Sequence, residues 1–501
     1  MKRYLRYIAV AFAVAATTSC GNDWLNTEPS TSIPSGDALN TYFDLVTAQN
    51  GMYDGLQEDK TYYGARMLYY GDVRADDMQA TAASKRTYAL YEMNYTVENA
   101  PEMWLAPYNV IRRANNIIKA IESGQIKDGA EASKNDILGQ AYAVRALVYF
   151  DLCRIYGAPY HLSNGESLGV PLVLTPVEYN HTAPRATLKA CYEQIIKDLE
   201  KGISLMGSAK QIGYFNSWAG KALLARVYLY QHDYAKAYTL ATDVITSSPY
   251  KLWSNTEYVE AWAKGGNSEL LFEIVNKGTD DWVDREAIGY LLSERGYDDF
   301  IITKAFYDQI NKNPNDVRLG LFVKPTELDK NKKKLINNVD VAGKNVYIKK
   351  FPGRSDFSPQ DVRVNNIPVL RLSDIYLVAA EAAALGGGPA ERGAFYANRI
   401  IKRADATTTD TLTAGTINLD RILEERRLEL VGEGHRFFDL MRNDKTVTRY
   451  TGESDKGWHC NIPLTANSHS FTNTFTRAIL PIPKAEMDAN TAMKGQQNPG
   501  Y

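Results

Sequence analysis

Apolar and aromatic residues recur at intervals of three and four along much of this chain, and this spacing constrains the fold more than any other feature of the sequence. In residues 104–121, Trp104, Tyr108, Ile111 and Ile118 fall on one helical face. The same spacing occurs in residues 44–56 and 137–156. Since a period near 3.6 places such residues on one side of a helix, the sequence predicts several amphipathic helices that each bury one face.

Two later segments each have the pattern of two helices joined by a short turn. In residues 218–249, Leu224, Ala225, Tyr228, Ala237 and Pro249 stand at the spacings of a tetratricopeptide unit. Residues 376–403 follow a related pattern around a turn that contains three glycines and a proline. Several such units in one chain predict a mainly α fold, a repeat-like, tetratricopeptide-like helical scaffold.

The stretch from about residue 253 to 368 interrupts this helical pattern. It mixes short strand candidates, residues 269–275 and 346–351, with turns rich in Gly, Asn and Asp. We interpret it as a loop-rich, partly β insertion. The mature chain therefore divides, in our prediction, into an N-terminal helical domain over residues 20–250 and a C-terminal domain over residues 251–501 that contains the insertion.

The first residues have the pattern of a secretory signal. Three basic residues precede an apolar run, residues 8–16, which is too short to cross a bilayer. Small residues then lead to Cys20, which looks like a lipobox cysteine, although Thr17 replaces the usual aliphatic residue. We predict a signal peptide over residues 1–19 and acylation of Cys20; the alternative is an ordinary signal peptide with an incidental cysteine. Because each buried acyl CH₂ contributes about 0.8 kcal/mol, two or three chains hold a protein on a membrane without a spanning helix.

Composition and motifs argue against several classes of site. Removal of the signal takes away three positive charges, which changes the formal net charge from −2 to −5, so nucleic acid is not an expected partner. The six histidines lack metal-ligand spacing and no cofactor motif appears, so we predict no cofactor and assign no metal site. Cys153, Cys191 and Cys460 imply no disulfide framework. Ser167 lies in a G-x-S-x-G match that lacks the strand and helix of a hydrolase elbow.

A series of motifs along the whole mature chain resembles the SusD/RagB family of outer-membrane nutrient-binding lipoproteins. Each motif alone is weak, but together and in this order they are specific. They are the helix at residues 141–156, GVPL at 169–172, PRAT at 184–187, the helix at 222–228, LRLSD at 370–374, EERRLEL at 424–430, GHRFFDL at 434–440, LPIP at 480–483 and QNPGY at 497–501.

The resemblance implies a role and a location. Proteins of this family are held at the cell outer membrane by a lipid on the cysteine that follows the signal, facing the extracellular side. They bind oligosaccharides or other polymers and pass them to a SusC-like TonB-dependent transporter. The resemblance therefore implies a non-enzymatic protein whose partners are a glycan, a SusC-like transporter and, through acylated Cys20, the outer-membrane lipid. It carries over no individual ligand contact, because the loops of such proteins vary.

Tyrosine is unusually abundant in this chain, with 33 tyrosines against 15 phenylalanines. A tyrosine ring stacks on the CH face of a sugar while its hydroxyl group hydrogen-bonds, and neighbouring Asp or Arg side chains fix the orientation of the ligand. Two loop stretches, residues 62–91 and 280–300, combine these residue types, so we predict glycan contacts there. The predicted contacts are Tyr69, Tyr70, Arg74, Asp76, Asp77 and Tyr88 in the first stretch, and Asp281, Trp282, Arg285, Tyr290 and Tyr297 in the second.

Alternatives remain open for these residues and for the function. The first stretch equally fits a structural ion cluster, and the Arg- and Glu-rich residues 424–442 fit a scaffold better than a catalytic site. A peptide is the alternative ligand, held through its backbone. A surface glycosidase with paired carboxylates has no specific motif here, and an adhesion protein is the remaining alternative.

Overall fold

The computed structural model describes most of the chain. The predicted signal peptide, Cys20, Asp281, Trp282 and Cys460 lie outside the described residues. The described residues are 39–57, 62–81, 84, 86–177, 180–277, 285–293, 296–323, 335–336, 339–340, 346–450 and 464–501.

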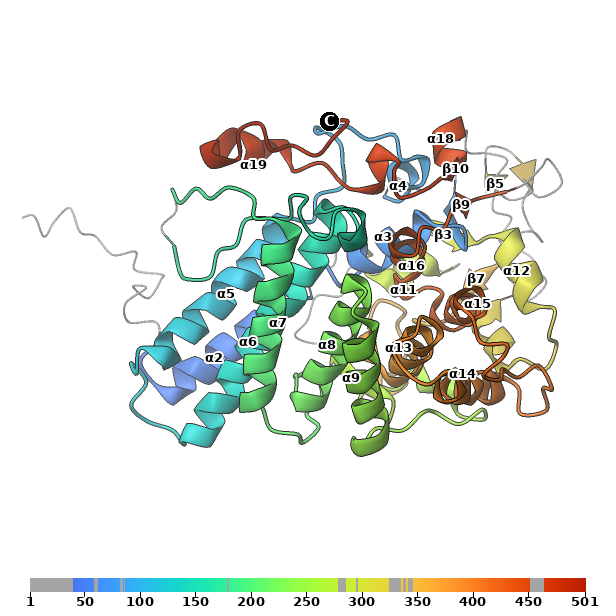
Figure 1. Ribbon diagram of the computed structural model, residues 1–501, viewed down its shortest axis with the longest axis horizontal. Helices are drawn as coiled ribbons and strands as arrows, with labels where there is room; N and C mark the ends of the chain where they lie inside the picture. The colour runs from blue at the N-terminus through green and yellow to red at the C-terminus, as the bar shows by residue number, and fades with distance from the viewer. Residues whose placement is uncertain are drawn as a thin grey trace, which may run out of the picture.

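Long helices form the main body of the molecule, and helices that follow one another in the chain pack side by side. They run from α5 at one end of Figure 1 to α14 at the other. Chain order and spatial order therefore agree, as in a stack of helical repeats. The long helices are α2 (Tyr42–Asp54), α5 (Leu105–Glu122), α6 (Glu131–Tyr156), α7 (Leu188–Leu205), α8 (Ser217–Gln231), α9 (Tyr234–Ser247), α13 (Leu372–Ala384), α14 (Ala390–Ala404) and α15 (Leu419–Leu430).

Local sequence signals set the ends of these helices. Thr41 and Asp44 form a capping box at the start of α2, and the side chains of Thr187 and Asn216 accept hydrogen bonds from backbone N–H groups in the first turns of α7 and α8. A side-chain cap of this kind contributes about 1 kcal/mol by satisfying an N–H group that has no partner inside the helix. The helix α6 ends before Gly157.

The long helices are accompanied by short helices and by two-stranded antiparallel sheets. The sheets pair β1 with β3, β2 with β8, β4 with β7, β5 with β6, and β9 with β10. The strands are β1 (Met78–Ala80), β2 (Leu270–Ile274), β3 (Phe300–Ile302), β4 (Phe322–Val323), β5 (Leu335–Ile336), β6 (Val339–Asp340), β7 (Tyr347–Ile348), β8 (Ile367–Arg371), β9 (Val447–Thr448) and β10 (Ser470–Phe471). The short helices are α3 (Arg66–Val73), α4 (Tyr88–Glu92), α10 (Tyr258–Ala261), α11 (Ile288–Leu292), α12 (Lys304–Ile310), α16 (Arg436–Arg442), α18 (Ala466–His469) and α19 (Lys484–Ala489), with 3₁₀ turns at Tyr160–Leu162, Val317–Leu321, Thr476–Ala478 and Thr491–Met493.

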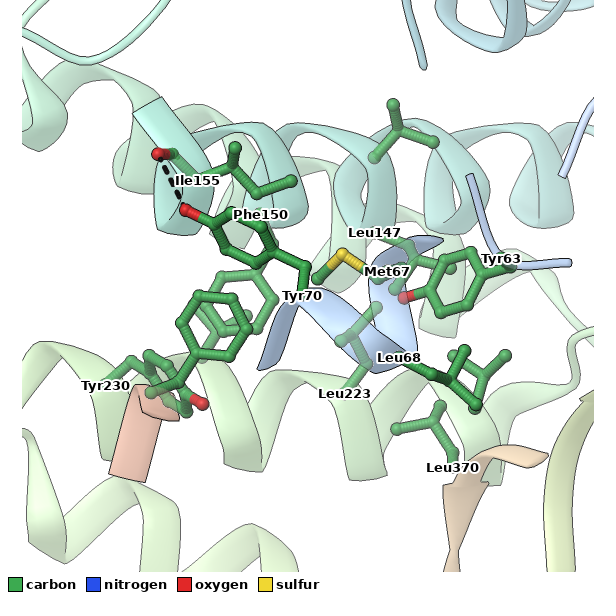
Figure 2. Packing of buried hydrophobic residues seen from close by; sticks show 14 of the residues in the cluster. Tyr63, Met67, Leu68, Tyr70, Leu147, Phe150, Ile155, Leu223, Tyr230 and Leu370 are labelled. Atoms are coloured by element: carbon green, nitrogen blue, oxygen red, sulfur yellow. Dashed lines mark hydrogen bonds between the residues drawn. The ribbon is translucent and has the colours of Figure 1, made fainter. Parts of the chain in front are cut away.

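The short helix α3 lies in the middle of the hydrophobic core. Figure 2 shows Met67, Leu68 and Tyr70 of α3 among side chains from α6, α8 and β8. The hydroxyl group of Tyr70 donates a hydrogen bond of 3.4 Å to the carbonyl oxygen of Ile155 at the end of α6. The position of α3 therefore depends on the long helices around it.

Buried ion pairs connect the C-terminal elements. Arg371 of β8 bonds Glu269 and Glu429 at 2.7 and 2.6 Å, and Arg403 of α14 lies 2.7 Å from Glu429. Burial alone would raise the pKa of Glu429, but Arg403, Arg371 and Arg318 hold it well below its ordinary value. All of these side chains are nearly inaccessible to solvent.

The same kind of pairing continues at the end of the Arg- and Glu-rich segment. Arg426 bonds Asp374 of α13 and Asp439 of α16, and Arg442 bonds Glu381 of α13. The interpretation of residues 424–442 as scaffold is confirmed, because its charged groups clamp helices together.

The structure confirms the predicted mainly α fold. The strand predicted at residues 269–275 is β2, and β7 covers part of the strand predicted at 346–351. Helices α8 and α9 pack against α13, so the core is continuous across residue 250; the division into two domains there stays a prediction. Among the described residues, no helix is both long enough and apolar enough to cross a membrane.

Candidate functional site

The two stretches in which we predicted glycan contacts meet in space, although about two hundred residues separate them. Strand β1 pairs with β3, with Ala80 opposite Phe300. Beyond the strands, the backbone N–H of Thr81 and the hydroxyl group of Thr87 both donate to the carbonyl oxygen of Asp299, at 2.9 and 3.0 Å. Figure 1 shows α3, α4, α11 and β3 gathered in one part of the molecule. The pairing of β1 with β3 therefore builds one candidate site from both stretches.

An aromatic pair lies at this junction. The rings of Tyr290 and Tyr297 are 5.1 Å apart and perpendicular, and both side chains are half-buried. The loop between them is tight, because the N–H of Tyr297 donates to the carbonyl oxygen of Tyr290 at 3.0 Å. A side chain at Gly296 would place its Cβ 1.9 Å from that same oxygen. Only glycine at position 296 permits this arrangement of the two rings.

Arg86 connects the aromatic pair to two carboxylates. Its guanidinium group lies 4.2 Å from the ring centre of Tyr297. Its Nε and Nη2 atoms both donate to the Glu286 carboxylate, with 2.5 Å between Nε and Oε2, and its Nη1 donates to Asp299 at 3.3 Å. The bond to Glu286 raises the pKa of Arg86. Burial raises the pKa of Asp299, and Arg86 opposes that effect.

This arrangement combines flat apolar surfaces with polar groups held in fixed positions. The side chains of Arg86 and Glu286 remain 24% and 22% exposed, so both are within reach of a ligand. Tyr88 is partly exposed and Arg285 is exposed at the same junction. Ring faces beside rigid hydrogen-bonding groups are suited to binding a ligand with both CH surfaces and hydroxyl groups.

Four predicted contacts of the first stretch are buried inside the molecule, which corrects their interpretation as a ligand surface. Tyr69, Tyr70, Arg74 and Asp77 are at most 3% exposed. Arg74 donates to the carbonyl oxygen of Arg477 at 2.6 Å and stacks on Tyr70.

Asp76 and Asp77 pair with arginines of the C-terminal half. Asp76 receives two hydrogen bonds from Arg436, at 2.8 and 2.9 Å, and Asp77 bonds Arg427. This part of the stretch is thus the structural ion cluster that the sequence left as an alternative. The predictions for Asp281 and Trp282 lie outside the described residues.

Sequence reasoning missed Glu286 and Asp299. Both lie inside the second stretch, but what distinguishes them is their contact with Arg86, which is about two hundred residues away in the chain. No local pattern signals that contact, because it arises from the pairing of β1 with β3.

Two other kinds of site, a nucleophile elbow at Ser167 and a metal centre, can be compared with the residues that the structure describes. Ser167 accepts a hydrogen bond from the hydroxyl group of Ser163 at 3.0 Å, and its segment lies between a 3₁₀ turn and an isolated β-bridge. This is not the strand-turn-helix context of a nucleophile elbow. In the described part of the chain, no cluster of three or more His, Cys, Asp or Glu side chains has the arrangement of a metal site.

Comparison with known families matches both halves of the chain. A family described as starch-binding and associating with the outer membrane matches residues 23–229. The SusD family matches residues 329–501. A curated relative, a SusD-like protein of Formosa agariphila, is 25% identical, with 89% of this chain and 93% of the relative aligned.

Solved structures agree over nearly the whole length. A putative sugar binding protein of Bacteroides vulgatus is 38% identical, with a TM-score of 0.82 over 93% of this chain and 99% of that one. A SusD superfamily protein of Bacteroides thetaiotaomicron is 36% identical, with a TM-score of 0.83 over 92% of this chain and 100% of that one. A laminarin binding SusD-like protein has the same fold at 23% identity, with a TM-score of 0.70 and 92% and 100% coverage. By fold and by sequence, this chain belongs to the SusD family.

Proposed function

We propose that this protein binds a glycan at the bacterial surface and delivers it to a SusC-like TonB-dependent transporter, without acting on it as an enzyme. Membership of the SusD family supports this proposal. So do the descriptions of its relatives as a putative sugar binding protein and a laminarin binding protein. The family description also supports an outer-membrane location. Acylation of Cys20 would supply the anchor, and protease treatment of intact cells tests whether the protein faces outwards.

The observation that carries the proposal is the perpendicular pair Tyr290 and Tyr297 beside the Arg86–Glu286 ion pair. Glycan recognition needs a flat apolar surface and polar groups at a fixed distance from it. Here Gly296 holds the rings together, and Arg86 is held by two carboxylates and by the Tyr297 ring. We place the glycan on this surface, with Arg285 and Tyr88 as further contacts; Trp282 and Asp281 remain contacts proposed from the sequence alone.

The test is calorimetric titration of the full-length protein in detergent with neutral and charged oligosaccharides. We expect Tyr297→Ala to weaken binding at least about tenfold, which corresponds to about 1.4 kcal/mol. Phe395→Ala on α14 is the matched control, because it removes an aromatic ring that is 47% exposed and lies on another element. Equal affinities for wild type and Tyr297→Ala, with both proteins folded, would show that the Tyr297 ring does not contribute to glycan binding.

An oligopeptide is the second candidate ligand, because acidic loops and backbone groups also bind extended chains. Peptide pools titrated under the same conditions separate the two ligands. Saturable binding of peptides but not of glycans would identify the ligand as a peptide. Release of reducing sugar from a bound glycan would contradict the non-enzymatic role. Co-purification with the transporter from the outer membrane tests the delivery step.

A further inference from the structure

The polar groups of Arg86 are already occupied within the protein. All three guanidinium nitrogen atoms donate to carboxylates of the same chain: Nε and Nη2 to Glu286, and Nη1 to Asp299. One face of the group is also stacked at 4.2 Å from the centre of the Tyr297 ring. Arginine binds anionic ligands through the same two-pronged geometry that Glu286 uses here. An anionic ligand would therefore have to displace Glu286.

The charges around Arg86 also disfavour an anionic ligand. Arg86 forms ion pairs with two carboxylates, Glu286 and Asp299, so this cluster holds one positive and two negative charges, while Arg285 is a separate exposed cation at the same junction. Asp299 is only 2% exposed, whereas the Glu286 side chain is 22% exposed, so Glu286 is the carboxylate that a ligand meets. Because Glu286 remains in contact with solvent, its repulsion of a charged ligand is strongest at low salt and weakens as salt is added. A ligand carboxylate or sulfate placed here would be repelled by the oxygen atoms of Glu286.

We propose that Glu286 makes this site selective for neutral glycans over glycans that carry uronic acid or sulfate groups. In this arrangement the sugar hydroxyl groups donate to Glu286, and the CH face of the ring lies on the tyrosine pair. Glu286 neutralises Arg86 and so removes the attraction of that guanidinium group for an acidic sugar. The inference rests on the proposed glycan-binding function and assigns a substrate class to the same site.

The experiment uses pairs of glycans that differ in charge but share a backbone. Suitable pairs are laminarin with carboxymethyl-laminarin, and xylan with glucuronoxylan. Each pair is titrated against the full-length protein in detergent. We expect the wild type to bind the neutral member of at least one pair at least tenfold more tightly than the charged member. Added salt should narrow that ratio, because it screens the repulsion.

Three variants show whether Glu286 causes the selectivity. In Glu286→Gln the side chain keeps its shape but loses its charge, so we expect the ratio of neutral to charged affinity to fall at least fivefold. Glu286→Asp keeps the charge and should preserve the ratio. Glu391→Gln removes an exposed glutamate of α14 and should leave both affinities unchanged. Circular dichroism and thermal melting show whether each variant is folded; if Glu286→Gln fails to fold, the salt dependence of the wild-type ratio decides.

The outcomes separate this inference from the proposed function. If the wild type binds the charged glycans as tightly as the neutral ones, or more tightly, the proposed selectivity is contradicted but the proposed glycan binding is not. The same holds if Glu286→Gln folds and keeps the wild-type ratio, or if the wild-type ratio is insensitive to salt. If no glycan of either kind binds, the proposed function fails and the selectivity fails with it.

Discussion

Arg74 and Arg86 belong to the same charged stretch of sequence, yet the fold uses them in different ways. Arg74 is fully buried and binds Tyr95 and the carbonyl oxygen of Arg477. Arg86 lies at the surface against Tyr297 and is partly exposed. Both residues are arginines, so the difference in their solvent exposure comes entirely from the elements that cover each side chain. The same argument separates buried Tyr70 from half-buried Tyr297.

The buried side chain of His435 should make the folding stability of the protein depend on pH. Burial lowers the pKa of His435 to about 3, with its Nδ1 atom buried and unpartnered. In the unfolded chain its pKa is about 6.5, so between pH 6.5 and 3 the unfolded state binds more protons than the folded state. The stability that depends on a neutral His435 is therefore fully present above pH 6.5. It is lost progressively as the pH falls towards 3, so the free energy of unfolding decreases over this range.

The test of this prediction is urea unfolding at pH 7.5 and pH 5. From this linkage, His435 removes about 2 kcal/mol of stability between these pH values. We expect His435→Gln to lose less stability than the wild type over the same interval, even if it is less stable at both pH values. His181→Gln, at an exposed histidine, is the control and should follow the wild type. An identical loss in wild type and His435→Gln would show that other groups cause the pH dependence.

At the scale of elements, the crossing of α6 and α7 depends on two glycines. A Cβ added to Gly139 of α6 would lie 2.8 Å from the carbonyl oxygen of Gly202 of α7 and 2.7 Å from Cγ of Met206. The two backbones are in contact there, which only small residues permit. The glycines at positions 139 and 202 thus have a direct structural cause.

We expect Gly139→Ala and Gly51→Ala to change stability in opposite directions. At Gly139 the added methyl group meets the backbone of α7 and should destabilise the fold by about 1 to 3 kcal/mol. At Gly51 of α2 a Cβ would meet no atom within 4 Å, so the higher helix propensity of alanine should stabilise it by about 0.5 to 1 kcal/mol. Urea unfolding measures both. Stabilisation by Gly139→Ala would contradict the close crossing.

At the scale of the whole molecule, buried ion pairs connect elements that are far apart in the chain. Glu429 of α15 binds Arg371 of β8 and Arg403 of α14. Asp76 and Asp77, after α3, bind Arg436 and Arg427 of the C-terminal half. The pairs of Asp76 and Asp77 hold the segment after α3 against α15 and α16, and thereby fix the frame on which the candidate site is built.

Removal of the Glu429 charge should therefore destabilise the protein strongly. In Glu429→Gln, Arg371 and Arg403 remain buried with less negative charge to neutralise them, which costs about 3 to 5 kcal/mol. Glu391→Gln, at an exposed glutamate, should stay within about 0.5 kcal/mol of wild type. Urea unfolding at pH 7 compares the two variants. A loss below about 1 kcal/mol in Glu429→Gln would show that the network contributes little.

The sequence by itself determined the helices, their order and the family. Helix periodicity, the caps at Thr41, Thr187 and Asn216, and the glycine-rich turn after α13 depend on residues within a few positions of one another. Such local signals survive in any tertiary context. The two tyrosine-rich stretches were predicted as two separate sets of glycan contacts, with Tyr290 and Tyr297 in the second; that they meet in space was not predicted, and glycan contact there stays a prediction.

Only the tertiary structure decided which of those side chains reach the surface. The burial of Tyr69, Tyr70, Arg74 and Asp77 follows from packing against helices that lie far away in the sequence. The role of Glu286 follows from the pairing of β1 with β3, which brings Arg86 to it. The solvent exposure and the ion pairing of a side chain depend on contacts between segments that are far apart in the chain. A local sequence pattern does not indicate which distant segments will make contact.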